Sequence, residues 1–312
     1  MIKYFEFEKE IEKLDQLITK LEAEEKKDTT KIEKLILEKD QILTKLYSNL
    51  KPWQKVQVSR HNDRPHTIDY LKIIFQDLIF LHGDKKYADD NAIIGGFAKI
   101  NNQSIIFLGT EKGNSMETRI KHNFGMAKPE GYRKAQRLIL LAEKFNLPVV
   151  TFVDTAGAFP GKDAEERGQS ESIASSILVF LKARTPTISV IIGEGGSGGA
   201  IGIATSDRVL MLEHSTYSVI SPEGCASILW RSTNFSQEAA NTLKLTSEDC
   251  KKYNIIDKII PEYPGGAHRN LKIQANLVKN ILLENINELK NIPIDDLVKT
   301  RKNKYLNITS EI

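Results

Sequence analysis

The sequence is poor in cysteine and lacks any long apolar run, and both shortages narrow the class of protein. Only two cysteines, Cys225 and Cys250, occur among 312 residues. They are too few for a disulfide framework or a four-cysteine zinc site. No apolar stretch approaches the ~20 residues that a membrane-spanning helix needs, and residues 1–10 mix charged and aromatic side chains. We therefore expect a cytoplasmic protein with no membrane association and no metal bound by this chain.

The sequence also lacks a large excess of either positive or negative charge. The 44 basic and 41 acidic side chains give a net charge of +3 and are mostly interleaved, which is typical of a solvated surface and not of a nucleic-acid-binding stripe. Nucleic acid is therefore not an expected partner. Residues 291–312 contain a basic cluster at Lys299, Arg301, Lys302 and Lys304. We expect this segment to be a solvated C-terminal tail without a function of its own.

The first 51 residues predict a helical hairpin. Apolar residues recur at heptad-like spacing in two runs, Ile11, Leu14, Ile18 and Leu21, then Ile32, Leu35, Ile42 and Leu46. The polar residues 24–31 separate the runs, residues 28–30 offer caps for the second helix, and Pro52 ends the segment. Each apolar stripe is too narrow for a helix that is stable alone. The hairpin must therefore pack on its own domain or serve as an assembly arm that binds a partner chain.

Residues 52–290 predict one α/β domain, because no low-complexity linker divides them. We expect helices at 68–81, from Pro129 onward, at 164–182 and at about 270–289, a hairpin of 92–100 and 104–110 around Asn101-Asn102, and strands at 148–153, 187–192, 208–212 and 255–260. The three strands at 148–153, 187–192 and 208–212 are continuously apolar. Such strands indicate a sheet that is covered on both faces.

The richest motif is GEGGSGGA at 193–200, between an expected buried strand and a short helix. Gly193, Gly195 and Gly198 fit a dinucleotide fingerprint, and Glu213 follows at about the expected ~20 residues. However, the helix available between 199 and 207 is too short for the ~30-residue βαβ unit that this fingerprint requires. The nucleotide interpretation is therefore weak.

The same motif fits two kinds of acyl-transfer site. In the first, Ser197 stands in a nucleophile elbow flanked by glycines, with Asp207, His214 and His268 as possible partners; alternatively, Ser197 is only a small residue. In the second, backbone amides at the helix start form an oxyanion hole, which needs no nucleophile. A second glycine turn, DTAGAFPG at 154–161, follows the preceding strand and would face the first turn across one cleft.

These motifs resemble those of the carboxyltransferase alpha subunits of bacterial and plastid acetyl-CoA carboxylase, members of the crotonase-like (ClpP/crotonase) superfamily. The matching stretches are 60–69 (RHNDRPHTID), 81–96, 123–135, 154–170, 193–200, 215–230 and 259–270. The paired helices before residue 52 and the absence of zinc cysteines fit as well, because the zinc ribbon of this family belongs to the beta subunit. The sequence departs from the family pattern at Ala156, Phe159 and Lys162-Asp163, and Phe159 lacks the hydroxyl group of the tyrosine that the family usually has there.

The resemblance implies a spiral of ββα repeats and an alpha2beta2 heterotetramer with its active site between an alpha and a beta chain. The implied reaction moves the carboxyl group from carboxybiotin, held on biotin carboxyl carrier protein, to acetyl-CoA. The product is malonyl-CoA, in the first committed step of fatty acid biosynthesis, within an ATP-dependent complex that includes biotin carboxylase. The biotin is not attached to this chain. A stand-alone crotonase-like hydratase, isomerase or hydrolase is the alternative.

The resemblance also places the site residues. It assigns the oxyanion hole for the biotin ureido oxygen to the backbone amides of Gly198 and Gly199. The substrate loops are then Gly195, Gly196 and Ser197 on one side and Thr155, Gly157, Ala158 and Phe159 on the other. Arg119, Lys121 and Arg133 are candidates for contacts with the phosphates of CoA, although a solvated helix surface explains them equally well. Because the biotin nitrogen itself can deprotonate the acetyl methyl group, the family requires no protein base.

Overall fold

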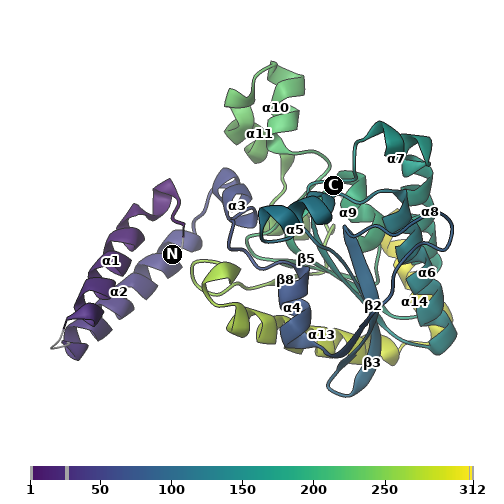
Figure 1. Cartoon of the computed structure of the whole chain (residues 1–312), viewed down its shortest axis with the longest axis horizontal. Coiled ribbons are helices and arrows are strands. Elements are labelled where there is room, and N and C mark those ends of the chain that lie inside the picture. The colour runs from purple at the N-terminus through teal and green to yellow at the C-terminus, as the bar shows by residue number, and fades with distance from the viewer. Residues whose placement is uncertain (1–2, 25–27, 309, 311–312) are drawn as a thin grey trace.

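One mixed sheet with helices on both faces forms the body of the protein (Figure 1). The computed structural model describes residues 3–24, 28–308 and 310. The strands are β1 (Gln76–Phe80), β2 (Ile93–Ile100), β3 (Gln103–Thr110), β4 (Val149–Thr155), β5 (Thr187–Gly196), β6 (Arg208–Leu212), β7 (Thr216–Ser218) and β8 (Lys258–Ile260). Their order is β1-β2-β3-β4-β5-β6-β8, and β7 pairs with the end of β5.

The helices alternate with these strands along most of the chain. They are α1 (Lys9–Ala23), α2 (Thr29–Tyr47), α3 (Pro52–Ser59), α4 (Thr67–Ile74), α5 (Met116–Lys121), α6 (Pro129–Phe145), α7 (Lys162–Glu166), α8 (Gln169–Lys182), α9 (Ser197–Ala204), α10 (Pro222–Trp230), α11 (Ser236–Leu243), α12 (Ser247–Lys252), α13 (Leu271–Lys290) and α14 (Ile294–Leu306). Within the part of the chain that the structure describes, no helix is long and apolar enough to cross a bilayer.

The predicted hairpin and the apolar strands are confirmed. β2 and β3 pair in antiparallel register around Asn101 and Asn102, whose φ angles of 45° and 64° are those of a two-residue hairpin turn. From β3 to β8 the pairs are parallel. Successive residues of β4 enter two different cores: Phe152 packs with residues of α4 and α13, whereas Val153 packs with residues of α6, α8 and α9. The sheet is therefore covered on both faces, as the sequence predicts.

The expected helix at 68–81 is wrong in its second half. α4 ends at Ile74, and Gln76–Phe80 becomes the edge strand β1, paired with β2. A side chain at Gly96 would collide with the backbone oxygen of Ile79, so this glycine is what lets β1 lie against β2. Tertiary pairing thus overrides the helical spacing of the apolar residues.

The expected helix at 164–182 is divided in two. Gly168 has a φ of 81°, which interrupts the helical backbone between α7 and α8. The expected strand at 255–260 is confined to β8, because Asn254, with a φ of 57°, turns the chain just before it.

The expectation of a solvated C-terminal tail is also wrong, because residues 294–306 form α14. The guanidinium of Arg301 is fully buried: it binds both carboxylate oxygens of Asp207 and donates to the backbone oxygens of Phe180, Ala183 and Thr185. A buried guanidinium requires this degree of pairing. The basic cluster therefore contains a structural anchor that composition does not distinguish from surface charge.

The N-terminal residues form the predicted hairpin of α1 and α2, which extends away from the sheet in Figure 1. The side chain of Asp28 caps α2 by accepting from Lys31 N. Residues 25–27 of the predicted break lie outside the described residues. At the base of the hairpin, the buried carboxylate of Glu8 accepts from Tyr47 Oη at 2.9 Å and from Arg269 Nη2 at 2.7 Å. These two hydrogen bonds fasten the hairpin to the α/β domain. Farther along the hairpin, Ile18, Leu21 and Ile32 form a separate small cluster among the described residues.

Candidate functional site

The two glycine-rich turns lie in direct backbone contact. Thr155, at the end of β4, is in register with Gly195 of β5. A Cβ atom at Gly199 would lie 2.6 Å from Ala158 N, and one at Gly196 would collide with Ala156 O. Glycine is therefore required at both positions for this close approach. The two turns therefore lie side by side at the carboxyl ends of β4 and β5, and Ala156, Glu194, Gly195 and Gly196 line one narrow pocket there.

The first turn of α9 presents backbone amides that no side chain caps. Gly196 is the residue before the helix, and among the described residues no side-chain hydrogen bond satisfies the amides that follow it. The first four N–H groups of a helix have no intrahelical acceptor, and the helix dipole adds a partial positive charge there. A Cβ atom at Gly198 would touch only the methyl groups of Ile173, at 3.7 Å. The turn therefore offers donors and has room beside Gly198.

Ser197 opens α9 with a φ of 50°, a left-handed conformation that is uncommon for serine. The residues proposed as its partners are engaged elsewhere. Asp207 binds Arg301 and Thr187, the ring of His214 packs edge-on against Tyr47 at 5.3 Å, and His268 stacks on His61 at 4.1 Å. No imidazole among the described residues hydrogen-bonds Ser197, so the arrangement that a serine hydrolase needs is not formed.

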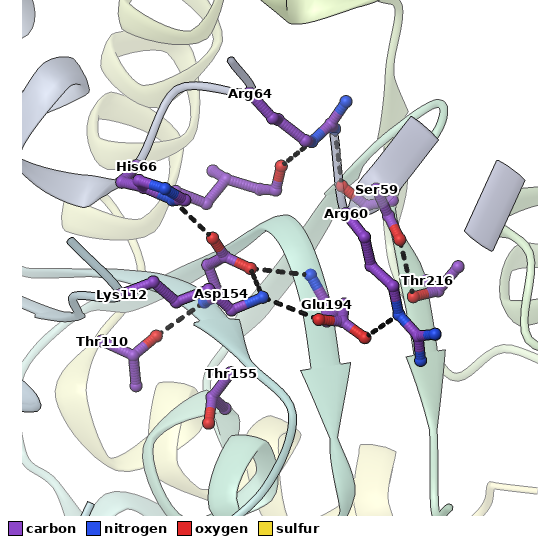
Figure 2. A network of polar contacts seen from close by, with 12 residues as sticks. Ser59, Arg60, Arg64, His66, Thr110, Lys112, Asp154, Thr155, Glu194 and Thr216 are labelled. Carbon is purple, nitrogen blue, oxygen red and sulfur yellow. Dashed lines mark hydrogen bonds and ion pairs between the residues drawn. The ribbon is translucent and has the colours of Figure 1, made fainter. Parts of the chain in front are cut away.

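A chain of buried ionic groups lies beside the glycine turns (Figure 2). Asp154 Oδ1 lies 2.8 Å from Lys112 Nζ and accepts from the backbone N–H of Glu194 at 3.0 Å. Asp154 Oδ2 accepts from His66 Nδ1 at 3.0 Å. Lys112 also donates to Glu194, which in turn accepts from Arg60 Nε at 2.6 Å. These contacts tie the ends of β3, β4 and β5 to the loop between α3 and α4.

The network fixes the charge of its members. Burial alone would raise the pKa of Asp154, but the charge of Lys112 and the hydrogen bond from His66 outweigh burial and lower that pKa. Burial would lower the pKa of Lys112, yet Asp154 and Glu194 raise it to about 12. Lys112 therefore stays protonated and the carboxylates stay ionised. None of these three groups is poised to exchange a proton near neutral pH.

A cavity of about 280 Å³ opens above this network. Its lining comes from the end of α3 and the loop after it, the segment after β3, α5 with the residues that follow it, and the two glycine turns: Ser59, Arg60, His61, Asn62, His66, Lys112, Arg119, Phe124, Asp154, Ala156 and Glu194. Polar groups thus gather at the carboxyl ends of adjacent parallel strands, where ligands of α/β proteins bind. Within residues 3–24, 28–308 and 310, no cluster of His, Cys, Asp or Glu could hold a metal ion.

The three basic residues predicted to contact the phosphates of CoA do not lie in one pocket. Arg119 of α5 lines the cavity and donates to Gly113 O at 3.3 Å, and Lys121 is exposed on the same helix. Arg133 lies on α6 in a different groove, where its guanidinium donates to Arg167 O at 2.6 Å. Among the positions that depart from the family pattern, Phe159 is held by two contacts: its N–H donates to Ala127 O, and the Lys128 ammonium lies 4.7 Å from the centre of its ring.

Solved structures share this fold at low sequence identity. A transcarboxylase 12S chain matches with a TM-score of 0.52 and 20% identity over 67% of this chain, but over only 40% of its own length. A chain of a Pseudomonas malonate decarboxylase hetero-tetramer matches with a TM-score of 0.57 and 14% identity, over 71% of this chain and 89% of its own. The chain thus spans less than half of the 12S polypeptide. These two matches show that the chain shares the fold of the 12S and malonate decarboxylase chains.

The family follows from the sequence comparisons. The model described as "Acetyl co-enzyme A carboxylase carboxyltransferase-like" matches residues 4–309. The acetyl-coenzyme A carboxylase carboxyl transferase subunit alpha of Ruegeria pomeroyi is 49% identical over 100% of this chain and 99% of its own length. That of Fusobacterium nucleatum is 49% identical over 96% of this chain and 97% of its own. The chain belongs to the family of acetyl-CoA carboxylase carboxyltransferase alpha subunits, as its motifs indicate.

Sequence reasoning did not single out the ionic network. Lys112 and Arg60 lie far apart in the chain, and nothing in their spacing predicts that both bind Glu194. A signal was nevertheless present, because Glu194 is a charged residue that continues an apolar strand into a glycine turn. A charge at such a position is retained only where partners neutralise it.

Proposed function

We propose that this chain is the alpha half of an enzyme that transfers a carboxyl group from carboxybiotin to acetyl-CoA and so forms malonyl-CoA. The observation that carries the proposal is the first turn of α9, where no side-chain hydrogen bond caps the helix among the described residues and open space lies beside Gly198. A family of full-length relatives supports the reaction.

In this proposal the amides of Gly198 and Gly199 donate to the ureido oxygen of biotin. The site fits such a group, because no side chain fills the space beside Gly198 and no cap competes for the amides. When bound, biotin supplies the transferable carboxyl group and the nitrogen that takes up the methyl proton. Two aimed amides stabilise the negative charge that develops on the ureido oxygen during transfer. Gly195, Gly196, Ser197, Thr155, Gly157, Ala158 and Phe159 shape the surrounding loops.

Thr155 and Asp154 keep these loops in place. The hydroxyl of Thr155 donates to Gly157 O at 2.8 Å and lies 3.1 Å from Gly157 N, so it closes the second turn on itself. Asp154 holds the backbone of Glu194, and a side chain at Gly193 would collide with that carboxylate. Rigid support of this kind is what an oxyanion hole needs, because its donors must be aimed before charge develops.

The partners follow from the family. We propose a beta subunit that completes an alpha2beta2 heterotetramer, carries the zinc ribbon and supplies most of the contacts with CoA. Biotin carboxyl carrier protein and biotin carboxylase would bring the carboxylated biotin, and the assembly would be cytoplasmic. The malonate decarboxylase neighbour, itself a hetero-tetramer, supports a multi-chain assembly. Of the candidates for the phosphates of CoA, Arg119 lines the cavity and Lys121 is exposed on the same helix, whereas Arg133 lies in a different groove.

We propose three parts for the chain: an assembly arm at 1–51, a carboxyltransferase domain at 52–290, and a C-terminal segment at 291–312 that packs on the domain through α14. The far end of the arm exposes Leu17, Ile36 and Leu37, which would suit a partner surface. Removing residues 1–50 would also leave the buried Arg269 without Glu8. The arm is therefore better tested by replacing Leu37 with glutamate and measuring tetramer formation by light scattering.

Reconstitution tests the function. The purified chain alone should neither carboxylate acetyl-CoA nor decarboxylate malonyl-CoA, because the wall that binds the thioester is missing. Adding the beta subunit and a biotin donor should restore turnover. Full activity of the isolated chain, by hydration or hydrolysis of an acyl-CoA, would favour the stand-alone crotonase-like alternative instead.

A further inference from the structure

The cavity of about 280 Å³ beside the glycine turns is lined by three cationic side chains, and two of them are already paired. Lys112 Nζ lies 2.8 Å from Asp154 and 2.7 Å from Glu194, and Arg60 Nε lies 2.6 Å from Glu194 (Figure 2). Arg119 also lines the cavity, but no ion pair among the described residues includes it. An unpaired guanidinium in a partly enclosed site is a ready partner for an anion.

The backbone after β3 holds Arg119 in position. The buried carboxylate of Glu111 accepts from the N–H groups of Gly113 and Ile68, at 2.8 and 2.9 Å, and so fixes this segment. Gly113 has a φ of 77°, and its oxygen accepts from Arg119 Nε at 3.3 Å. This contact uses only Nε and leaves the two terminal nitrogens of the guanidinium for a ligand. A guanidinium fork that is held in advance loses little entropy when it binds a planar anion.

A strained segment forms another part of the cavity wall. Asn123 and Phe124 have φ angles of 47° and 54°, and Phe124, for which this conformation is an outlier, lines the cavity. Gly125 follows with a φ of 77°, and a Cβ atom there would lie 2.8 Å from Lys112 Cγ. Backbone strain of this kind clusters at ligand sites. The segment brings an aromatic ring into the same cavity as the unpaired guanidinium, a combination that suits an anion on a short apolar group.

The charges around the cavity favour a ligand with a single negative charge. Asp154 and Glu194 belong to the lining, and Glu223 of α10 accepts from Arg60 Nη1 at 2.6 Å. One unpaired guanidinium balances one carboxylate. A phosphate monoester carries about −1.5 to −2 charges at pH 7 and would leave negative charge uncompensated beside these carboxylates. The volume also lies at the lower end of ligand pockets, about 300 Å³, so the cavity accepts one end of a ligand and not the nucleotide part of CoA.

We propose that Arg119 binds the carboxyl group that is transferred, and not a phosphate of CoA. The proposal rests on the function proposed above. When the methyl carbon of the acetyl enolate forms its bond to the carbon of CO2, one π-electron pair of CO2 moves onto oxygen, and the negative charge of the enolate ends on the new carboxylate. The guanidinium of Arg119 stabilises this charge where it develops. Arg119 thereby distinguishes malonyl-CoA from acetyl-CoA, which lacks that carboxylate.

The test compares the binding of malonyl-CoA and acetyl-CoA, which share every phosphate. Complexes of beta subunit with the parent chain, with Arg119→Ala and with Arg119→Lys are titrated with each ester by calorimetry. Arg119→Ala should raise the Kd of malonyl-CoA about 10- to 100-fold, the loss expected for a hydrogen bond between charged groups, and change the Kd of acetyl-CoA less than about threefold. Arg119→Lys keeps the charge without the fork and should fall between. The matched control is Arg184→Ala, at a side chain 56% exposed just before β5, which should bind both esters like the parent.

An uncharged ligand tests the same contact from the other side. In the parent complex malonamyl-CoA, the amide of malonyl-CoA, should bind about 10- to 100-fold more weakly than malonyl-CoA, and this ratio should fall toward one in Arg119→Ala. A ratio that stays at the parental value in Arg119→Ala would overturn the proposal. Gel filtration and circular dichroism report whether each complex assembles, and Arg119→Gln replaces an alanine variant that does not.

The pattern across the two esters separates the alternatives. Equal weakening of malonyl-CoA and acetyl-CoA would assign Arg119 to a phosphate of CoA and refute its contact with the carboxylate. An unchanged Kd for malonyl-CoA would refute both contacts. A parent complex that shows the expected dependence on Arg119 but makes no malonyl-CoA from a biotin donor would contradict the proposed reaction and leave the carboxylate contact standing.

Discussion

Replacing Gly199 with alanine should damage carboxyl transfer far more than the same change at Gly198. The two glycines are adjacent and neither has a positive φ, so strain in the backbone does not separate them. The two positions differ in the space that a side chain would have. A Cβ atom at Gly199 would lie 2.6 Å from Ala158 N, whereas one at Gly198 would meet only Ile173 methyl groups at 3.7 Å. The first contact is closer than atoms tolerate, and its neighbours are backbone atoms that cannot rotate away.

The size of the effect follows from the geometry. To accept Gly199→Ala, the turns at 154–161 and 193–200 must move apart, and the amides of α9 then lose their aim. Loss of one oxyanion-hole donor typically costs about 10²–10³ in kcat, or ~3–4 kcal/mol, and we expect a loss in that range. Gly198→Ala adds a methyl group in open space and leaves the amide in place, so its loss should be at least about tenfold smaller, or ~1.4 kcal/mol less in activation free energy.

The assay is malonyl-CoA formation by complexes of each variant with beta subunit, purified by gel filtration. Binding of acetyl-CoA is measured separately and should change little, because the beta chain is proposed to hold that substrate. The reasoning is refuted if intact complexes of Gly199→Ala turn over at the parental rate, or if Gly198→Ala is the more damaging change.

Three further predictions concern serine chemistry, the C-terminal helix and pH. Ser197→Ala should keep turnover within about tenfold, or ~1.4 kcal/mol, since no imidazole among the described residues hydrogen-bonds Ser197. Labelling of Ser197 by a fluorophosphonate would contradict this. Arg301→Ala should lower the free energy of unfolding, measured by urea titration, by about 3–5 kcal/mol, because Asp207 would stay buried without its partner. A loss below ~1 kcal/mol would mean that α14 is a dispensable tail. Burial, and the nearby charges of His61 and Arg64, lower the pKa of His268 to about 3 from 6.5. In the unfolded chain His268 binds a proton below about pH 6.5, whereas in the folded chain it does so only near pH 3. The free energy of unfolding therefore falls as the pH falls from about 6.5 to 3. His268→Gln should lose less stability between pH 7.5 and about 5 than the parent chain, and equal losses would show that another group is responsible.

The sequence by itself determined the elements whose signals are local. Asn101-Asn102 predicts a two-residue hairpin turn because asparagine tolerates positive φ, and both residues adopt it. The apolar strands predict a sheet covered on both faces, since each strand contributes to two cores. The glycine turns also carry a local signal, because a run of residues without side chains mainly serves to let two backbone segments approach closely.

Tertiary structure decided what depends on residues far apart in the chain. The segment 76–80 has helical spacing of apolar residues, but the free edge of β2 and the space at Gly96 make it a strand. In the sequence Arg301 does not differ from the other basic residues near the C-terminus. In the structure Asp207 and three backbone carbonyl groups surround its guanidinium. The network of Arg60, Lys112 and Glu194 likewise joins three distant segments. The local spacing of residues specifies the periodicity of a helix or strand and the position of a turn. The partner of an edge strand or of a buried charged side chain is specified only by residues from distant parts of the chain.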